Sequence, residues 1–380
     1  MQRHIRPSQL SLWLFSLFIC LALLTTADTL AKPIERTRQQ AATSPTKSAH
    51  KANPKKAFKV TLGKAFGHSA SVKALAAALA KQTGLPKAWV QQQIASAHLL
   101  PQVQNMIMPA PYAVAKNWAA YRARFLEPNR IQKGVAFWQT HADVLARAEK
   151  TFGVPARYIV GILGVETYFG QHQGQFKVSD VLATLSLAFP ADHPQAEERR
   201  QFFTTEFGYF LQQRFKQPSL KQQLGSYAGA SGWPQFMPSS IAKFAVDFDQ
   251  DGHVNLAHSA ADAIGSVAHY FQAYGWQTGM PTHFEVVVQA SESDLSALLA
   301  PDIVPSWSAS HLVEKKIGLT EAGRQFSGAL ALVELHNGGD PSSYVAGTEN
   351  FFVITRYNRS SYYALAVIEL GEAIEQALLR

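Results

Sequence analysis

The sequence has 380 residues, 47% of them hydrophobic, which is enough for a sizeable core and two or three subdomains. Its formal net charge is +8, but residues 32–56 carry +6 of that charge and residues 57–380 only +1. A nucleic-acid-binding domain needs a basic face on its folded part, so this distribution argues against nucleic acid as a partner.

Residues 1–31 have the pattern of a secretory signal peptide. Arg3 and Arg6 precede an apolar run at residues 10–24, which is too short for a comfortable transmembrane helix. Small residues follow this run, and both Ala27 and Ala31 end acceptable cleavage sites. We therefore expect an exported protein.

The chain has a single cysteine, Cys20, inside this apolar run. A lipid-attachment cysteine needs a small residue before it, and Ile19 is bulky and branched, so the pattern favours soluble export over a lipid anchor. Cleavage would leave no cysteine, so no disulfide framework is expected.

Residues 32–56 are rich in Lys, Ala, Thr, Ser and Pro and almost free of large apolar side chains. Such a segment cannot bury enough surface to order itself. We interpret it as a flexible basic linker.

From residue 57 the apolar spacing is mostly helical. We expect an N-terminal helical region at residues 57–115 and a larger helical region at residues 116–280. The expected helices cover residues 72–79 (capped by Ser71), 88–97, 118–125, 131–152, 156–167, 202–215, 240–245 (with a serine cap) and 260–274.

The pattern changes after Pro281. Residues 283–288 and 329–335 are β-like, and a short helix is expected at residues 292–299. Residues 351–355 are a further strand candidate, and residues 361–379 return to a helix. The sequence thus predicts a mainly α protein, α+β overall, with a small α+β subdomain at residues 281–350 and a C-terminal segment at residues 351–380.

Glu166 is the first candidate for chemistry. It ends an expected helix that otherwise consists largely of Ile, Leu, Val and Gly, and no Lys or Arg lies within one helical turn of it. Burial there should raise the pKa of the carboxyl, so that it can donate a proton near neutral pH. Taken alone, this segment is equally consistent with a glutamate that simply reaches water at a helix end.

The segment at residues 225–240 (GSYAGASGWPQFMPSS) is the second candidate. Its glycines allow backbone to approach a ligand closely. Ser226 and Gln235 could hydrogen-bond sugar hydroxyls or an acetamido group, and Trp233 and Phe236 offer flat faces for pyranose rings. Taken alone, an ordinary glycine-rich loop is the better interpretation.

Together the segments resemble a known family. The motifs at residues 164–167 (GVET), 226–230 (SYAGA), 235–240 (QFMPSS) and 354–360 (ITRYNRS) occur in the order typical of lytic murein transglycosylases of the membrane-bound lytic transglycosylase B type. The resemblance runs from about Tyr121 to the C-terminus. It implies a lysozyme-like helical core at residues 116–280, with Glu166 as the catalytic residue and a cleft lined by Tyr121, Ser226, Gln235, Tyr357, Asn358 and Tyr363.

The same resemblance implies a reaction that needs one carboxylate. Ordinary glycosidases use two carboxylates, but neither the glycine-rich loop nor residues 357–363 contain an Asp or Glu. Glu166 would protonate the oxygen between N-acetylmuramic acid and N-acetylglucosamine. It would then act as base on the muramyl C6 hydroxyl, giving a 1,6-anhydro product in the periplasm.

Residues 247–255 match the first nine positions of an EF-hand loop, with acids at positions 1, 3 and 5 and Gly252 at position 6. The twelfth position is His258 rather than glutamate. The resembled family closes a longer loop with an aspartate, which points to Asp262, although the spacing here is one residue longer. We expect a structural Ca²⁺ held by Asp247, Asp249, Asp251, the carbonyl of His253 and Asp262.

Two alternatives remain open at this stage. One is a hydrolytic muramidase on the same fold, and the other is a non-catalytic peptidoglycan-binding or scaffold protein. A calcium sensor is a third and more distant alternative, because one such loop does not make a paired EF-hand. We expect a monomer that acts on peptidoglycan glycan strands, with cell-wall synthesis or secretion complexes as further candidate partners.

Overall fold

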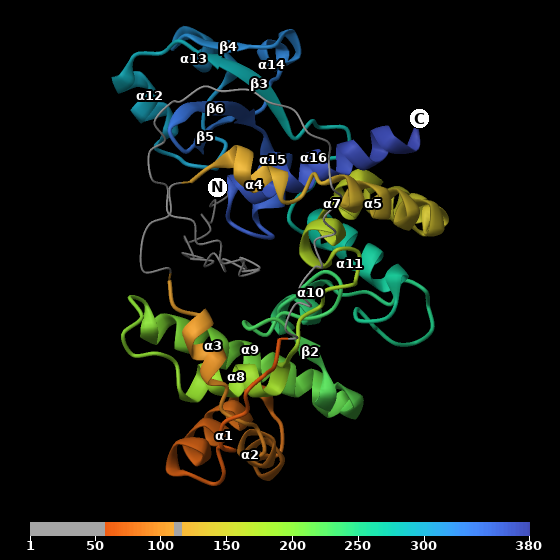
Figure 1. The fold of residues 1–380 in the computed structure, drawn as a ribbon, viewed down its shortest axis with the longest axis vertical. Helices are drawn as coiled ribbons and strands as arrows, with labels where there is room; N and C mark the ends of the chain where they lie inside the picture. Colours follow the sequence, from red (N-terminus) through yellow and green to blue (C-terminus); the bar gives the residue numbers. More distant parts are fainter. Residues whose placement is uncertain (1–57, 110–115) are drawn as a thin grey trace, which may run out of the picture.

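The computed structural model describes residues 58–109 and 116–380, so the signal-peptide and linker predictions lie outside the described residues. Helices dominate, and one small four-stranded sheet accompanies them (Figure 1), which confirms the predicted mainly α class. Within the described part of the chain, no helix is long and apolar enough to cross a membrane.

The first hydrophobic cluster joins the N-terminal helices to two helices from much later in the chain. Figure 1 shows them together in the lower body. They are α1 (Ala70–Thr83), α2 (Lys87–Ala95), α3 (Pro101–Met106), α8 (Val178–Leu187) and α9 (Ala196–Lys216). The predicted boundary at residues 115/116 therefore does not coincide with the packing, because α8 and α9 share a core with residues 72–107.

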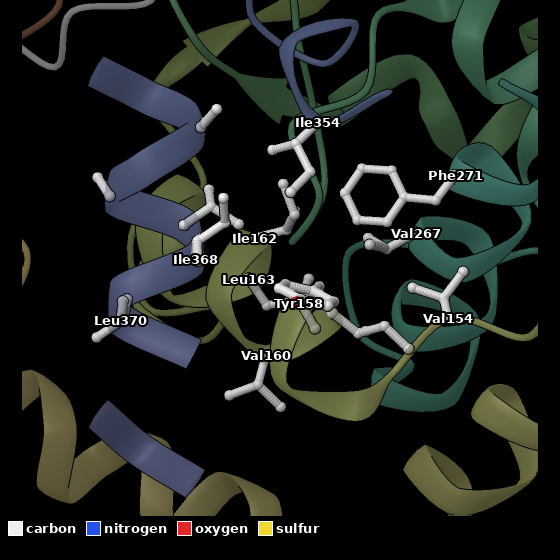
Figure 2. Close-up of a cluster of buried hydrophobic side chains, with 14 of the residues drawn as sticks. Val154, Tyr158, Val160, Ile162, Leu163, Val267, Phe271, Ile354, Ile368 and Leu370 are labelled. Carbon is white, nitrogen blue, oxygen red and sulfur yellow. The ribbon is translucent and has the colours of Figure 1, made fainter. Parts of the chain in front are cut away.

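The second and largest cluster contains the segment with Glu166. It is built from α4 (Trp118–Ala123), α5 (Pro128–Thr140), α6 (Ala142–Phe152), α7 (Ala156–Thr167), α10 (Pro238–Phe244), α11 (Ala260–Ala273), α15 (Glu349–Thr355) and α16 (Ser361–Leu378). Figure 2 shows Ile162 of α7, Phe271 of α11, Ile354 of α15 and Ile368 of α16 gathered around one centre.

Helices α7 and α16 approach each other unusually closely, because glycines stand at their crossing. A Cβ on Gly161 would lie 2.3 Å from the carbonyl oxygen of Val367, and a Cβ on Gly371 would lie 2.2 Å from that of Arg157. Only glycine leaves room for backbones at this separation. The crossing brings the end of α7 next to the start of α16.

The third cluster covers one face of the sheet, whose strand order is β4-β3-β6-β5 with all neighbours antiparallel. The strands are β3 (His283–Val288), β4 (Ile317–Leu319), β5 (Ala331–Asn337) and β6 (Asp340–Gly347), and the helices packed here are α12 (Glu292–Leu299), α13 (Ala309–Glu314) and α14 (Glu321–Gln325). A two-stranded ladder of β1 (Phe176–Lys177) and β2 (Leu224–Gly225), and a 3-10 helix η1 (Pro218–Gln222), complete the described elements.

Four local predictions are wrong. Residues 351–355 are not a strand but helix α15, whose N-terminus is capped by the buried hydroxyl of Thr348. The expected helix at residues 131–152 is two helices, α5 and α6, separated at His141 (φ −116°, ψ 24°). Ser69, not Ser71, caps α1. Helix α10 has no serine cap, and Pro238 occupies its first position.

Candidate active site

Glu166 lies in the last turn of α7, and the crossing with α16 brings Tyr363 against it. The phenol of Tyr363 donates a hydrogen bond of 2.6 Å to Oε1 of Glu166. Tyr363 stands in the first turn of α16, where its own amide bonds the capping hydroxyl of Ser360. The acid and its partner are thus fixed by two helix ends rather than by flexible loops.

Burial is the main influence on the Glu166 carboxyl. Although the residue keeps some solvent-accessible surface, desolvation raises its pKa from 4.5 to about 7, and the hydrogen bond from Tyr363 acts in the opposite direction. At neutral pH a substantial fraction of this carboxyl is protonated, as a general acid requires. The residual exposure leaves it open to a substrate.

Tyrosine side chains surround the carboxyl. The rings of Tyr357 and Tyr363 stack at 6.3 Å with an interplanar angle of 16°, and Tyr270 lies 4.8 Å from Tyr357. Desolvation raises the pKa of all three phenols well above 10, so they stay neutral hydrogen-bond donors. The sequence did not identify Tyr270 as a site residue. A tyrosine in an amphipathic helix has no motif that distinguishes a site residue from an ordinary core residue.

Ser226 and Gln235 are largely buried and shape their own loop. The hydroxyl of Ser226 accepts the amides of Ala228 and Ala230, at 3.3 and 3.1 Å. Gln235 has a φ of 48° and its amide group donates to the carbonyls of Gly232 and Gln173. The loop reaches the carboxyl site through Tyr357, whose phenol donates to the carbonyl of Pro234 at 2.6 Å.

Of the two aromatic rings predicted to face a sugar, Phe236 is buried and Trp233 is partly exposed. Phe236 is 2% exposed and packs against Tyr270 and Tyr357. The indole of Trp233 donates to the carbonyl of Ala257 and fills the space that a Cβ on Gly170 would need. Phe236 therefore supports the site from within the core, and Trp233 packs against that core with part of its surface exposed.

The remaining cleft candidates are Tyr121 and Asn358. Tyr121, on α4, is close enough to raise the pKa of Tyr363, and its ring meets that of Tyr362 edge-on at 5.8 Å. Asn358 follows Tyr357, and its buried Oδ1 has no hydrogen-bond partner among the described residues. Glu166, Tyr357, Tyr363 and Tyr121 are therefore gathered in one place.

The turn after Glu166 locks α7 to the glycine-rich loop. The hydroxyl of Thr167 donates to the carbonyl of Trp233 at 2.8 Å and accepts the amide of Gly170 at 3.0 Å. Gly170 has a φ of 81°, and a Cβ there would lie 2.3 Å from the indole of Trp233. The two segments that carry the first two candidate motifs are thus joined beside the carboxyl, by a contact between residues 66 apart in the sequence.

Comparison with known families gives a direct match. The family model described as "Transglycosylase SLT domain" matches residues 67–372, which is most of the chain. The chain belongs to this transglycosylase family. Its members are enzymes that act on peptidoglycan, so the resemblance stated from the motifs is confirmed.

Individual relatives of this transglycosylase support the same family assignment. Membrane-bound lytic murein transglycosylase B of Escherichia coli is 39% identical over 266 residues, 68% of each chain. The soluble lytic transglycosylase SltB1 of Pseudomonas aeruginosa superposes with a TM-score of 0.72 at 36% identity, covering 81% of this chain and 99% of that one. The Escherichia coli lytic transglycosylase Slt35, in a structure with calcium, gives 0.71 at 32% identity, covering 87% and 100%.

The transglycosylase also brings its acidic loop together. Oxygen atoms of Asp247, Asp249 and Asp251 lie within 4.8 Å of one another. The carboxylate of Asp247 accepts the amides of Asp251 and Gly252, and Gly252 has the φ of 91° that the turn needs. An all-oxygen donor set of this charge is the kind that Ca²⁺ prefers.

Asp262, the predicted closing ligand, is fully buried at the start of α11. Its oxygens accept the amides of Phe248, Asp249 and Asn255, so it already holds both ends of the loop. It is not one of the three clustered aspartates. Oδ1 accepts two of these amides and Oδ2 accepts one, so one lone pair of Oδ2 is left for a cation.

Proposed function

We propose that this transglycosylase cleaves the β-1,4 bond between N-acetylmuramic acid and N-acetylglucosamine without water, giving 1,6-anhydro-muramyl products. The observation that supports this most is a single, desolvated carboxyl. Among the described residues, no second Asp or Glu contributes to the pKa shift of Glu166. A hydrolase of the ordinary kind would need a second carboxylate about 5–10 Å away.

In the proposed mechanism, Glu166 begins protonated and gives its proton to the glycosidic oxygen as the bond to muramyl C1 breaks. The resulting carboxylate is stabilised by the phenol of Tyr363, which donates to it at 2.6 Å. It then takes the proton of the muramyl C6 hydroxyl while that oxygen attacks C1. The acid is regenerated, and no water enters the balance.

Other residues would orient the sugar. Tyr121, Tyr357 and Asn358 line the same site from α4 and the segment before α16. The buried, unpartnered Oδ1 of Asn358 is an acceptor that a substrate N–H or O–H could satisfy. Ser226 and Gln235 act by holding the loop whose backbone faces the substrate, and Trp233 and Phe236 act as its support.

The decisive experiment is mass spectrometry of digested, purified sacculi. Wild-type enzyme should release anhydro-muramyl ends, and Glu166→Gln should lower turnover about 10²- to 10⁴-fold, because the amide cannot donate or accept the proton. Reducing muramic ends would show a hydrolase. Undiminished cleavage by Glu166→Gln would remove the assigned role and mean that another group supplies the proton, whereas a wild-type protein that cleaves nothing would favour a scaffold.

We also propose that the enzyme is exported and works in the periplasm, where its glycan substrate lies, and that one Ca²⁺ binds the acidic loop. Asp247, Asp249, Asp251 and the His253 carbonyl would hold the ion, with Asp262 closing the loop. Its proposed contribution is structural, because the carbonyls of Leu256 and Ala257, at the end of this loop, hold Trp233 and Gln173 beside the active site.

A further inference from the structure

Helix α7 ends in a strained turn immediately after Glu166. Tyr168, Phe169 and Gly170 follow one another with φ values of 54°, 57° and 81°. Two of these are not glycine, and such residues occupy the left-handed region only where surrounding structure holds them there. Because Glu166 stands two residues before Tyr168, whatever holds this turn also sets the direction of the acid.

The turn leaves a carbonyl of α7 without its usual donor. The amides of Tyr168 and Phe169 both donate to the carbonyl of Leu163, so the i+4 amide expected for Gly164 points elsewhere. A side chain replaces it: Nη1 of Arg130, on the neighbouring helix α5, donates to the carbonyl of Gly164 at 2.7 Å. A cation at a helix C-terminus also complements the helix dipole.

Arg130 also grips the strained residue itself. Its guanidinium lies 4.6 Å from the ring centre of Tyr168 and 5.3 Å from that of Phe125. The phenol of Tyr168 donates to Glu127 at 3.1 Å, and Glu127 caps α5 and pairs with Arg130 at 3.9 Å. One side chain thus binds both the carbonyl before Glu166 and the ring after it.

The arginine is placed as an internal support rather than a surface ion pair. Its side chain is 16% exposed, and its buried Nε has no hydrogen-bond partner among the described residues, its nearest acceptor being the Glu127 carboxylate at 3.9 Å. Exposed ion pairs contribute little to a fold, whereas losing this donor would leave a carbonyl at the end of α7 unpaired. Lys133, also on α5, lies over the same tyrosine ring at 4.9 Å from its centre, but only Arg130 contacts both that ring and the carbonyl of Gly164.

We propose that Arg130 is a positioning residue for Glu166, acting through the carbonyl of Gly164 and the ring of Tyr168. The inference rests on the proposed catalytic role of Glu166. Arg130 does not touch the carboxyl or the substrate. It fixes the turn so that the carboxyl meets Tyr363 and the glycosidic oxygen in one orientation.

The test compares Arg130→Met with Arg124→Met, which removes an exposed arginine on the same stretch of chain. Kinetics on soluble glycan strands should show kcat falling about 10- to 100-fold for Arg130→Met with KM within about twofold, since misplacing an acid slows chemistry without weakening binding. Arg124→Met should leave both constants at the wild-type values. Melting curves establish that the variants are folded at the assay temperature.

Two outcomes would overturn the proposal: a folded Arg130→Met enzyme with the kcat of Arg124→Met, or a raised KM with unchanged kcat, which would mark a substrate contact. If Arg130→Met does not fold, Arg130→Lys decides. A lysine keeps the charge but cannot bond the carbonyl and lie flat on Tyr168 together, so kcat should fall at least about threefold, and a wild-type kcat would overturn the proposal. Glu166→Gln in the same assay tests the catalytic role of Glu166 separately. If this variant keeps its activity, the catalytic role is wrong, independently of the result for the Arg130 variants.

Discussion

At the scale of single residues, the acid is the feature most accessible from sequence. An unpaired glutamate among apolar neighbours predicts a raised pKa, and the structure gives that shift and its cause. The partners were harder to assign. Phe236 has a flat face that suits a sugar or a core equally well, and only its burial against Tyr357 decides between the two.

The pKa of Glu166 leads to a prediction about pH. The reaction starts from the protonated acid, so kcat/KM should fall as pH rises through about 7. Tyr363 donates to the carboxylate and therefore favours the charged form. Removing that donor in Tyr363→Phe should raise the pKa and displace this alkaline limb to higher pH.

The measurement is a pH–rate profile on soluble glycan strands. Tyr344→Phe is the matched control, because it removes a phenol that donates to Glu334 on the sheet, away from the acid. Its profile should coincide with the wild type. A limb in Tyr363→Phe that stays in place or moves toward acid would contradict the assigned hydrogen bond.

At the scale of elements, periodicity located most helices but failed where tertiary contacts decide. Residues 351–355 are a run of aromatic and β-branched side chains, yet a buried Thr348 cap starts a helix there. The helix expected at residues 131–152 contains no Gly or Pro at its break. Its two halves separate at His141 because α5 packs on α16 while α6 packs on α11, and no local pattern records those partners.

The crossing of α7 and α16 can be tested with Gly161→Ala. A helix interior usually gains about 1 kcal/mol from this change, but here the new Cβ would lie 2.3 Å from the backbone oxygen of Val367. Overpacking of this kind costs about 1–3 kcal/mol, so the net effect should be lower stability and a wider crossing. Because that crossing sets the contact of Glu166 with Tyr363, activity should fall as well.

Denaturant unfolding measures the stability change, and Gly208→Ala in α9 is the control. There the added Cβ meets only side-chain atoms of Gln82 and Thr83, at 3.3 Å or more. That variant should be neutral or stabilised. If Gly161→Ala is as stable as Gly208→Ala, the crossing of α7 and α16 has room for the added methyl group, and the close approach of the two helices is not required.

At the scale of the whole molecule, the sequence motifs located the segments of the site but did not predict which helices share a hydrophobic core. The N-terminal helices share a core with α8 and α9, and the C-terminal helix α16 completes the core around α7. These contacts join segments about 80 to 200 residues apart, so neither composition nor periodicity could reveal them. The acidic loop also makes contacts that are distant in sequence, because its end holds the glycine-rich loop and Gln173.

Because the end of the acidic loop contacts the glycine-rich loop, we expect metal removal to affect the active site. Without a cation, the clustered carboxylates of Asp247, Asp249 and Asp251 repel one another, and the strain passes through Leu256 and Ala257 to Trp233. A bound ion at about 100 times its dissociation constant adds about 2.7 kcal/mol. Chelation should therefore lower Tm by roughly 4 °C and reduce glycan cleavage, and added Ca²⁺ should restore both.

Differential scanning calorimetry with and without chelator measures the change in Tm. Two variants distinguish an effect of the acidic loop from a general effect of charge. Asp249→Asn removes one clustered carboxylate and should abolish the response to chelator. Asp192→Asn removes an exposed charge outside the loop and should keep the full response. A wild-type Tm that chelator leaves unchanged would mean that the amide bonds to Asp262 alone hold the loop, and that the active site does not depend on an ion.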